Sequence, residues 1–535
     1  MNAPAASLPD QPADQPTQRA FGSARALLTA GSWNLVAQFL PAGLGIALTP
    51  YVLHHLGLER YGVLALTLAI TTFLGSFDGG VSAAAGRYFA LFASVEDRAS
   101  TGRYVLTLTA ALGAFGLAVS SLLWLVAGSL LAALHVPAGL LGDSVRLLRL
   151  LGVLIALGLL RNVLASVLQA RQRYGPASLT SLASSVVYGI GMVLVLQRGG
   201  GLPAIGLVLT AQAVLQVALL LPPAVRLLSV SDGCWCSRTE LREFLGYCAQ
   251  TQVVGLSTMV NQLADTLIVG ALLGVRPVAL YSAGAGFAAP LRGLALGALA
   301  PLATALAHAR GTGGEQGARA EFLRLQRGWV IGITGWGAAA SAAAYFGVLA
   351  WLGPQFQLSA VVATVLIVGS SLNLLTGVLT SHLQVMGRPD LDARYSLVAA
   401  GLNLALTLPC AAAFGLVGVV LATSVGSLLG SCYLLRLVRT RYDPTLRGFF
   451  ADVPWRPGAL AGAVVVGLEL LIRPLVVTGP LGLFTCALPP VLGLVLYARL
   501  VLGAQGAAGA RSALGSWRRA PDRPAGAPAD TGDRR

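Results

Sequence analysis

The chain has 535 residues, of which 56% are apolar and only 11% charged, and its mean hydropathy is +0.75. A soluble domain carries about 25% charged residues, so this composition excludes a water-soluble globular protein. The formal net charge is +15 and every basic residue is arginine. These arginines gather in the loops between apolar blocks, which is typical of membrane proteins rather than of nucleic-acid-binding proteins. No nucleic-acid partner is therefore expected.

Long apolar blocks predict an all-α polytopic membrane protein. About 20 apolar residues span a bilayer as a helix, and blocks such as 361–368 do not alternate in polarity as the strands of a membrane barrel do. Fourteen transmembrane spans are predicted, at 27–53, 62–92, 104–133, 144–170, 176–197, 202–222, 245–273, 277–308, 328–352, 358–386, 393–413, 415–438, 457–477 and 480–502. The second and eighth are long, which indicates a tilted or broken helix.

The arginines also predict the topology. With the N-terminus in the cytoplasm, most arginines outside the spans fall on the cytoplasmic side, as the positive-inside rule requires. An even number of spans returns the C-terminus to the same side. The polar segments 1–24 and 503–535 have the composition of disordered tails, and the first lacks the order of a cleaved signal peptide.

The two halves of the chain resemble each other. Leu56-Gly57 lies between the first two spans, and Leu273-Gly274 recurs 217 residues later, between the seventh and eighth. Leu168-Gln169 ends the fourth span, and Leu383-Gln384 ends the tenth, 215 residues later. Each half has six spans that start from the same side, which predicts a parallel repeat of two six-helix lobes around a central cleft. The predicted divisions are a tail (1–24), a first lobe (25–228), a linker (229–244), a second lobe (245–440), a loop (441–456), a two-helix hairpin (457–502) and a basic tail (503–535).

Among the arginines within the predicted span bounds, three are candidate site residues: Arg292 midway along 277–308, and Arg161 and Arg87 nearer the cytoplasmic ends of their spans. An arginine at mid-membrane costs about 2.5–3.5 kcal/mol on insertion scales, so such residues usually face a cavity. The forked donors of a guanidinium match phosphate oxygens. We therefore expect these arginines to bind an anionic, phosphate-containing substrate. For Arg87 and Arg161, snorkelling to the cytoplasmic interface is an equal alternative.

Within the two predicted lobes, Asp78 and Asp265 are the acids at membrane depth. Intramembrane carboxylates mark proton and ion pathways, so they are candidates for H⁺ or Na⁺ coupling; the alternative is a static partner for an arginine on a neighbouring helix. The neutral polar residues predicted to line the cleft, or else to form interhelical hydrogen bonds, are Asn34, Gln38, Asn261, Gln262 and Asn373.

No catalytic or metal-binding group is predicted. Cys234 and Cys236 form a lone C-x-C, and zinc sites usually need four ligands. We expect neither a bound metal nor an organic cofactor, although an H⁺ or Na⁺ gradient fits the two intramembrane acids.

Several short motifs stand in a specific order over residues 27 to 440. They are Leu56-Gly57, Tyr61-Gly62, Phe77-Asp78-Gly79, Arg87-Tyr88, Asp265, Leu273-Gly274, Tyr281-Ser282-Ala283, Pro301, Gly387-Arg388, Asn403 and Phe414-Gly415-Leu416-Val417-Gly418. In this order and spacing they resemble the polysaccharide flippases of the multidrug/oligosaccharidyl-lipid/polysaccharide exporter superfamily.

The resemblance implies a transporter in a bacterial inner membrane, with both termini cytoplasmic. It would move an oligosaccharide linked to polyprenyl pyrophosphate, typically undecaprenyl pyrophosphate, from the cytoplasmic to the outer leaflet. Alternating access through a cationic cleft is the implied mechanism, and O-antigen or exopolysaccharide the implied product. Membrane lipids, a polysaccharide polymerase and glycosyltransferases are the implied partners.

Other functions fit the residues less well. Drug exporters of this superfamily commonly carry an acid in the first helix, where this chain has Asn34 and Gln38. The branch that flips the peptidoglycan precursor tends to place arginine within that helix, and here only Arg25 lies near it. A membrane-embedded polysaccharide polymerase or acyltransferase would need long outward loops with catalytic groups. A scaffold without transport would leave Arg292 unexplained. We therefore expect no enzymatic activity.

Overall fold

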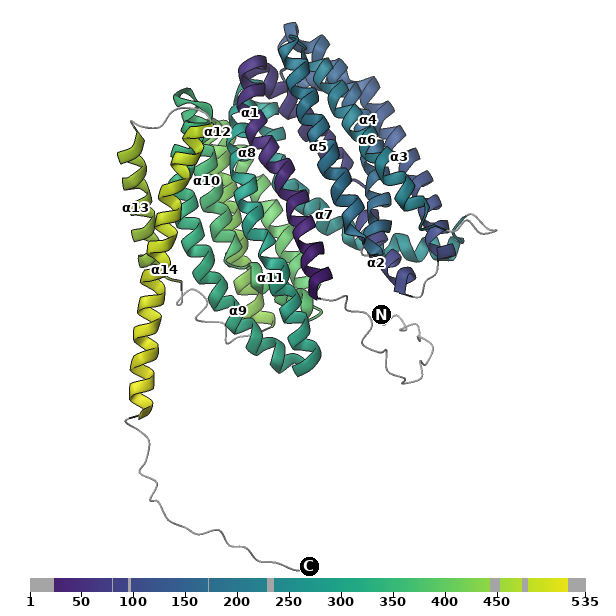
Figure 1. The fold of residues 1–535 in the computed structure, drawn as a ribbon. Coiled ribbons are helices and arrows are strands. Elements are labelled where there is room, and N and C mark those ends of the chain that lie inside the picture. The colour runs from purple at the N-terminus through teal and green to yellow at the C-terminus, as the bar shows by residue number, and fades with distance from the viewer. Residues whose placement is uncertain are drawn as a thin grey trace, which may run out of the picture. The chain divides into compact units, whose positions relative to one another are not determined.

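A computed structural model describes residues 24–78, 80–94, 98–171, 173–228, 235–442, 453–473 and 480–517. Every regular element in these ranges is a helix (Figure 1). The helices are α1 (Ala24–Gly75), α2 (Val81–Ser94), α3 (Arg98–Ala133), α4 (Ala138–Ala170), α5 (Tyr174–Gln197), α6 (Leu202–Val225), α7 (Arg238–Leu273), α8 (Val275–Gly297), α9 (Leu299–Leu352), η1 (Pro354–Phe356), α10 (Gln357–Leu374), α11 (Gly377–Val385), α12 (Pro389–Arg441), α13 (Trp455–Ile472) and α14 (Pro480–Trp517).

These helices confirm the predicted all-α membrane fold. Within the described ranges, nine helical stretches are long and apolar enough to cross a bilayer, and two shorter helices are also apolar. Some of these stretches contain two predicted spans, separated by a non-helical glycine: Gly57 in α1, Gly314 in α9 and Gly415 in α12. All three have positive φ, which glycine tolerates because it has no Cβ. The chain therefore bends where the sequence predicts that one span ends and the next begins.

Three predicted spans are interrupted, and the one at 277–308 breaks at Ala298, between α8 and α9. The span at 62–92 breaks between α1 and α2, where the backbone N–H of Gly80 donates to Oδ1 of Asp78 at 2.9 Å. The span at 358–386 breaks between α10 and α11, where Gln326 Nε2 and Trp329 Nε1 donate to backbone carbonyls at 2.9 and 2.6 Å. A helix break at membrane depth needs such partners, because lipid cannot satisfy the freed backbone groups.

Contacts divide the chain into two units, Met1–Leu256 and Ser257–Arg535. The division falls inside α7, whereas the sequence predicts a linker at 229–244. Residues 229–234 lie outside the described ranges, and α7 already begins at Arg238, ahead of the predicted span start at 245.

Each unit is organised around a central helix. In unit 1, α4 packs against α1, α2, α3, α5 and α6 (Figure 1), and its side chains Leu147, Leu148 and Leu151 are completely buried. In unit 2, α10 packs against α8, α9 and α12. A Cβ added at Gly369 of α10 would lie 2.5 Å from Oγ of Ser424 in α12, so the two backbones approach closely.

The last two helices pack on each other and on α9 (Figure 1). The Tyr497 hydroxyl in α14 donates to the backbone carbonyl of Ile331 at 2.7 Å. The helix α14 continues to Trp517, beyond the predicted end at 502. The rest of the predicted tails, residues 1–23 and 518–535, lies outside the described ranges.

Candidate functional site

Unit 2 contains a cavity of about 560 Å³, formed by α7, α8, α10 and α12. This volume lies within the range of about 300–1,000 Å³ that is usual for ligand pockets. Three of the residues predicted from the sequence meet there: Arg292, Asp265 and Asn373. The polar lining consists of Asp265, Tyr281, Arg292, Ser370, Asn373, Tyr395, Ser396, Asn403, Thr423, Ser424 and Ser427.

Asp265 connects three helices at the wall of this cavity. Its side chain is 1% exposed, and its Oδ2 accepts hydrogen bonds from the Tyr281 hydroxyl at 3.0 Å and from Thr423 Oγ1 at 2.6 Å. Its Oδ1 has no hydrogen-bond partner among the described residues. The partners seen for Asp265 are thus hydroxyl groups on α8 and α12, and one buried carboxylate oxygen keeps its capacity to accept a proton or a ligand.

Arg292 supplies positive charge to the same cavity. It lies on α8, its side chain is half-buried, and its Nε is buried without a hydrogen-bond partner in the described part of the chain. A buried guanidinium N–H without an acceptor is costly. An anionic group bound in the cavity would supply that acceptor.

Asn373 lines the same cavity from α10 and links that helix to two residues of α12. Its Nδ2 donates to the Tyr395 hydroxyl at 2.6 Å and to Ser431 Oγ at 3.3 Å. Tyr395 and Asn373 line the cavity, whereas Ser431 is 1% exposed and lies behind them. Sequence reasoning singled out Asn373 but neither partner, because a tyrosine and a serine in a long apolar helix carry no distinctive spacing.

Unit 1 has a polar network that joins three of its helices in a similar way. Arg161 in α4 donates from Nη1 to Gln216 Oε1 in α6 at 3.4 Å, and from Nη2 to Asn162 Oδ1 at 2.9 Å. Gln216 Nε2 in turn donates to Ser184 Oγ in α5 at 2.9 Å. Arg161 lies about 14 Å before the end of α4, at 1.5 Å per residue. Through Arg161 and Gln216, these contacts link α4 to α6 and α5.

The other predicted site residues are less informative. Asp78 lies in the turn before α2, half-buried, where it accepts from the Gly80 amide; neither Asp78 nor Arg161 is among the residues that line the unit 2 cavity. The remaining predicted residues have side chains that the structure does not describe: Arg87, Asn34, Gln38, Asn261 and Gln262.

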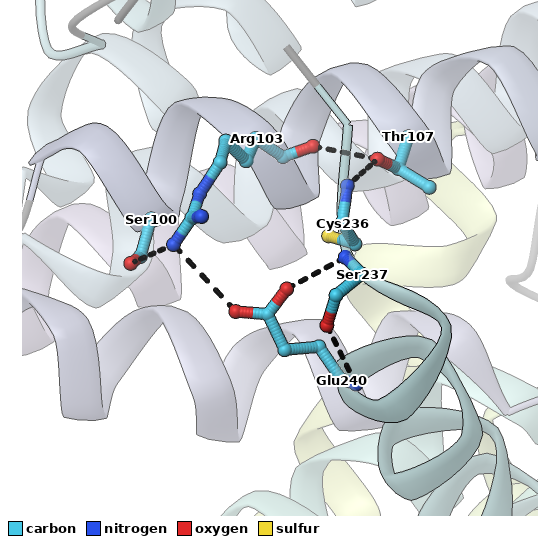
Figure 2. A network of polar contacts seen from close by, with 6 residues as sticks. All are labelled: Ser100, Arg103, Thr107, Cys236, Ser237 and Glu240. Atoms are coloured by element: carbon cyan, nitrogen blue, oxygen red, sulfur yellow. Dashed lines mark hydrogen bonds and ion pairs between the residues drawn. The ribbon is translucent and has the colours of Figure 1, made fainter. Parts of the chain in front are cut away.

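A second polar network joins the start of α7 to α3 within unit 1 (Figure 2). Ser237 and Glu240 form a capping box, in which the Ser237 N–H donates to Glu240 Oε2 at 2.7 Å and the Glu240 N–H donates to Ser237 Oγ at 3.2 Å. Arg103 Nη2 lies 3.6 Å from Glu240 Oε1, and the Cys236 N–H donates to Thr107 Oγ1 at 3.1 Å. These contacts hold the first turn of α7 against α3.

The charges of this second network follow from its geometry. The pKa of Glu240 is lowered, first by the hydrogen bond from the Ser237 backbone and then by the Ser237 side chain and by Arg103. Burial raises the pKa of the Cys236 thiol. Cys234, the other cysteine of the C-x-C, lies outside the described residues.

Comparison with known sequences finds one family and one relative that match part of the chain. The sequence profile of the family described as "Polysaccharide biosynthesis protein" matches residues 55–304, somewhat less than half the chain. A Shigella flexneri protein named "Putative O-antigen transporter" is 23% identical over 256 residues, which are 47% of this chain and 59% of that protein. The match therefore spans about three-fifths of that relative's length.

Solved structures match over most of the chain. The lipid II flippase MurJ, in an inward closed conformation, aligns with a TM-score of 0.67 at 14% identity, over 88% of this chain and 98% of MurJ. An inward-facing multidrug resistance transporter of the MATE family aligns with a TM-score of 0.61 at 12% identity, over 84% and 99%. A transporter of the MOP superfamily from Pyrococcus furiosus aligns with a TM-score of 0.55 at 14% identity, over 78% of this chain and 94% of that transporter.

The chain is thus a multi-pass membrane protein with the transporter fold shared by MurJ and the MATE proteins. Within that class, the family profile and the O-antigen relative confirm the predicted resemblance to polysaccharide flippases of the multidrug/oligosaccharidyl-lipid/polysaccharide exporter superfamily.

Proposed function

We propose that this protein is a flippase that moves oligosaccharide linked to polyprenyl pyrophosphate from the cytoplasmic to the outer leaflet of a bacterial inner membrane. The observation that carries the proposal is Arg292, a cation in the polar cavity of unit 2 whose Nε has no protein acceptor among the described residues. A pyrophosphate oxygen is the acceptor that matches a guanidinium. The neutral hydroxyl and amide groups around it suit an attached sugar.

The proposed cycle needs no covalent chemistry. A pyrophosphate headgroup must leave water to cross the bilayer, and a polar cavity with a fixed cation lowers the barrier by replacing part of its hydration. Alternating access would then expose the cavity first to the cytoplasm, where both termini would lie, and afterwards to the outer face. The two predicted six-helix lobes would be the moving parts. Polysaccharide polymerase and glycosyltransferases are the proposed functional partners.

Asp265 supports a coupling role in the same proposal. It is a buried carboxylate on the cavity wall, its partners on Oδ2 are two hydroxyl groups, and its Oδ1 is unpartnered within the described chain. Loading and release of H⁺ or Na⁺ at such a group would link transport to an ion gradient.

The same acid favours one alternative. A cation-coupled multidrug exporter would use Asp265 to attract a cationic substrate, and MATE proteins share the fold. Arg292 in the same cavity disfavours that alternative, because like charges repel in a site of low dielectric constant.

The test is the leaflet in which lipid-linked glycans reside in cells that lack this gene. We expect them to accumulate on the cytoplasmic face and to return outward when the wild-type gene is restored. Arg292→Ala should fail to restore delivery at normal protein level, and Arg292→Lys should restore it only in part, because an ammonium lacks the forked donors. Arg327→Ala, which removes an exposed arginine of α9, is the matched control. Normal glycan delivery without the gene, together with altered sensitivity to cationic drugs, would favour the exporter.

A further inference from the structure

We propose that Asn373, Tyr395 and Ser431 form a subsite that selects the sugar next to the pyrophosphate. Asn373 and Tyr395 would contact the sugar hydroxyls, and Ser431 would hold the other two in position. This inference rests on the proposed function and deepens it, because it assigns substrate specificity to particular neutral residues of the unit 2 cavity.

The geometry leaves one face of the cluster open to a ligand. The Asn373 side chain uses Nδ2 for both of its hydrogen bonds, to Tyr395 and to Ser431, and its Oδ1 accepts none from the described residues. That oxygen is not fully buried, so a ligand can reach it. Ser431 Oγ donates to the Ser427 carbonyl at 2.9 Å, so it is held from behind. The cluster therefore presents a carbonyl acceptor and a phenol to the cavity in a fixed arrangement.

Packing alone does not require this cluster. The contact of α10 with α12 is already made by Gly369, which lies tightly against Ser424, and by Ser424 Oγ, which donates to the Val365 carbonyl at 2.9 Å. Asn373 adds a further polar bridge in a region where leucine would pack without polar atoms. Polar side chains in the membrane interior are unfavourable unless they are used.

The chemistry of the cluster suits a sugar. Amide, phenol and hydroxyl groups offer both hydrogen-bond donors and acceptors, as sugar hydroxyls do. A site built to hydrogen-bond a substrate hydroxyl discriminates strongly against an analogue that lacks it, since its own polar groups are then left unpaired. Arg292 lines the same cavity from α8, so a phosphate bound there leaves its first sugar within the cavity that Asn373 and Tyr395 also line.

The test measures selectivity instead of total transport. The full chain would be reconstituted in lipid nanodiscs, and binding measured for undecaprenyl pyrophosphate alone and for the same lipid bearing one glucose, one galactose or one N-acetylglucosamine. The variants are Asn373→Ala and Tyr395→Phe. Tyr497→Phe is the matched control, because it also removes one buried hydroxyl of unit 2 but lies outside the cavity lining.

We expect the wild type to prefer at least one sugar-bearing lipid over the bare carrier. Both cluster variants should reduce that preference about three- to tenfold, the effect of one lost hydrogen bond. They should leave affinity for the bare carrier unchanged. The control Tyr497→Phe should also leave affinity for the bare carrier unchanged. Equal weakening of bare and sugar-bearing lipid in Asn373→Ala, or an unchanged preference in both variants, would overturn the inference while leaving the flippase proposal intact. A wild type that binds none of the four lipids would overturn both.

Discussion

Gly57 and Gly274 have the same unusual backbone conformation, although they lie in different units of the chain. Gly57 has φ 74° and ψ 168°, and Gly274 has φ 86° and ψ −176°. This region of backbone space is essentially restricted to glycine. Gly199 and Gly415 form a second pair, at nearly the same separation along the chain. Their φ angles are also positive, 72° and 60°. The matching backbones support the predicted internal repeat, because both pairs stand between corresponding helices.

Replacement of Gly57 or Gly274 by alanine should destabilise the protein by about 1 kcal/mol or more, because a Cβ is strained at positive φ even where nothing lies within 4 Å. The measurement is the midpoint of thermal unfolding in detergent. Gly286→Ala is the control: it lies in the interior of α8 with open space around it and should be neutral or stabilising. Equal loss of stability in all three variants would contradict the conformational argument.

Asp265→Asn should reduce transport while the protein level stays normal. The amide can still accept from Tyr281 and Thr423 but cannot exchange a proton or carry charge. The measurement is outward delivery of lipid-linked glycan at several external pH values, with Asp390→Asn, at the exposed start of α12, as control. A rate equal to that of wild type at every pH would remove Asp265 from ion coupling.

Arg161 and Gln216 should act as a unit. Arg161→Ala and Gln216→Leu each remove the same hydrogen bond between α4 and α6, so their combined effect on transport should be smaller than the sum of their separate effects. Arg161→Lys should resemble Arg161→Ala more than wild type, because an ammonium cannot reproduce the two-armed contact with Gln216 and Asn162. Strict additivity, or full activity of Arg161→Ala, would favour a snorkelling role instead.

The first turn of α7 should lose protection at low pH. The folded pKa of Glu240 is lowered, so its stabilising contacts with Ser237 are fully present above the ordinary glutamate pKa and are lost as pH falls through the folded value. Ser237→Ala should weaken this helix start by about 1 kcal/mol. Hydrogen exchange of the amides near Glu240, corrected for the intrinsic effect of pH, measures both changes. Glu240→Gln should remove most of the pH dependence, and persistence of that dependence in the variant would assign it to another group.

The helices and several of the breaks between them follow directly from the sequence. Apolar blocks of bilayer length admit only helices, since lipid cannot satisfy a free backbone. Glycines such as Gly57 and Gly415 stand where predicted spans meet, and there the backbone bends. The break at 375–376 is different, because it is stabilised by Gln326 and Trp329, which lie far away along the chain. No local pattern announces such long-range donors.

The candidate site shows the same division. Arg292, Asp265 and Asn373 stand out in the sequence because a polar or charged group inside an apolar span is unfavourable unless it is used, and the structure brings all three to one cavity. Tyr395, Ser431, Gln216 and Ser184 do not stand out, because such residues satisfy themselves in many ways within a helix.

Composition and the order of apolar blocks were thus sufficient for the fold class and the charged candidates, because the bilayer penalises each exposed polar group one residue at a time. Which side chains face one another was decided by helix packing alone. That choice depends on close approaches such as Gly369 against Ser424. These residues are distant in sequence, yet they lie so close that a methyl group added to Gly369 would not fit.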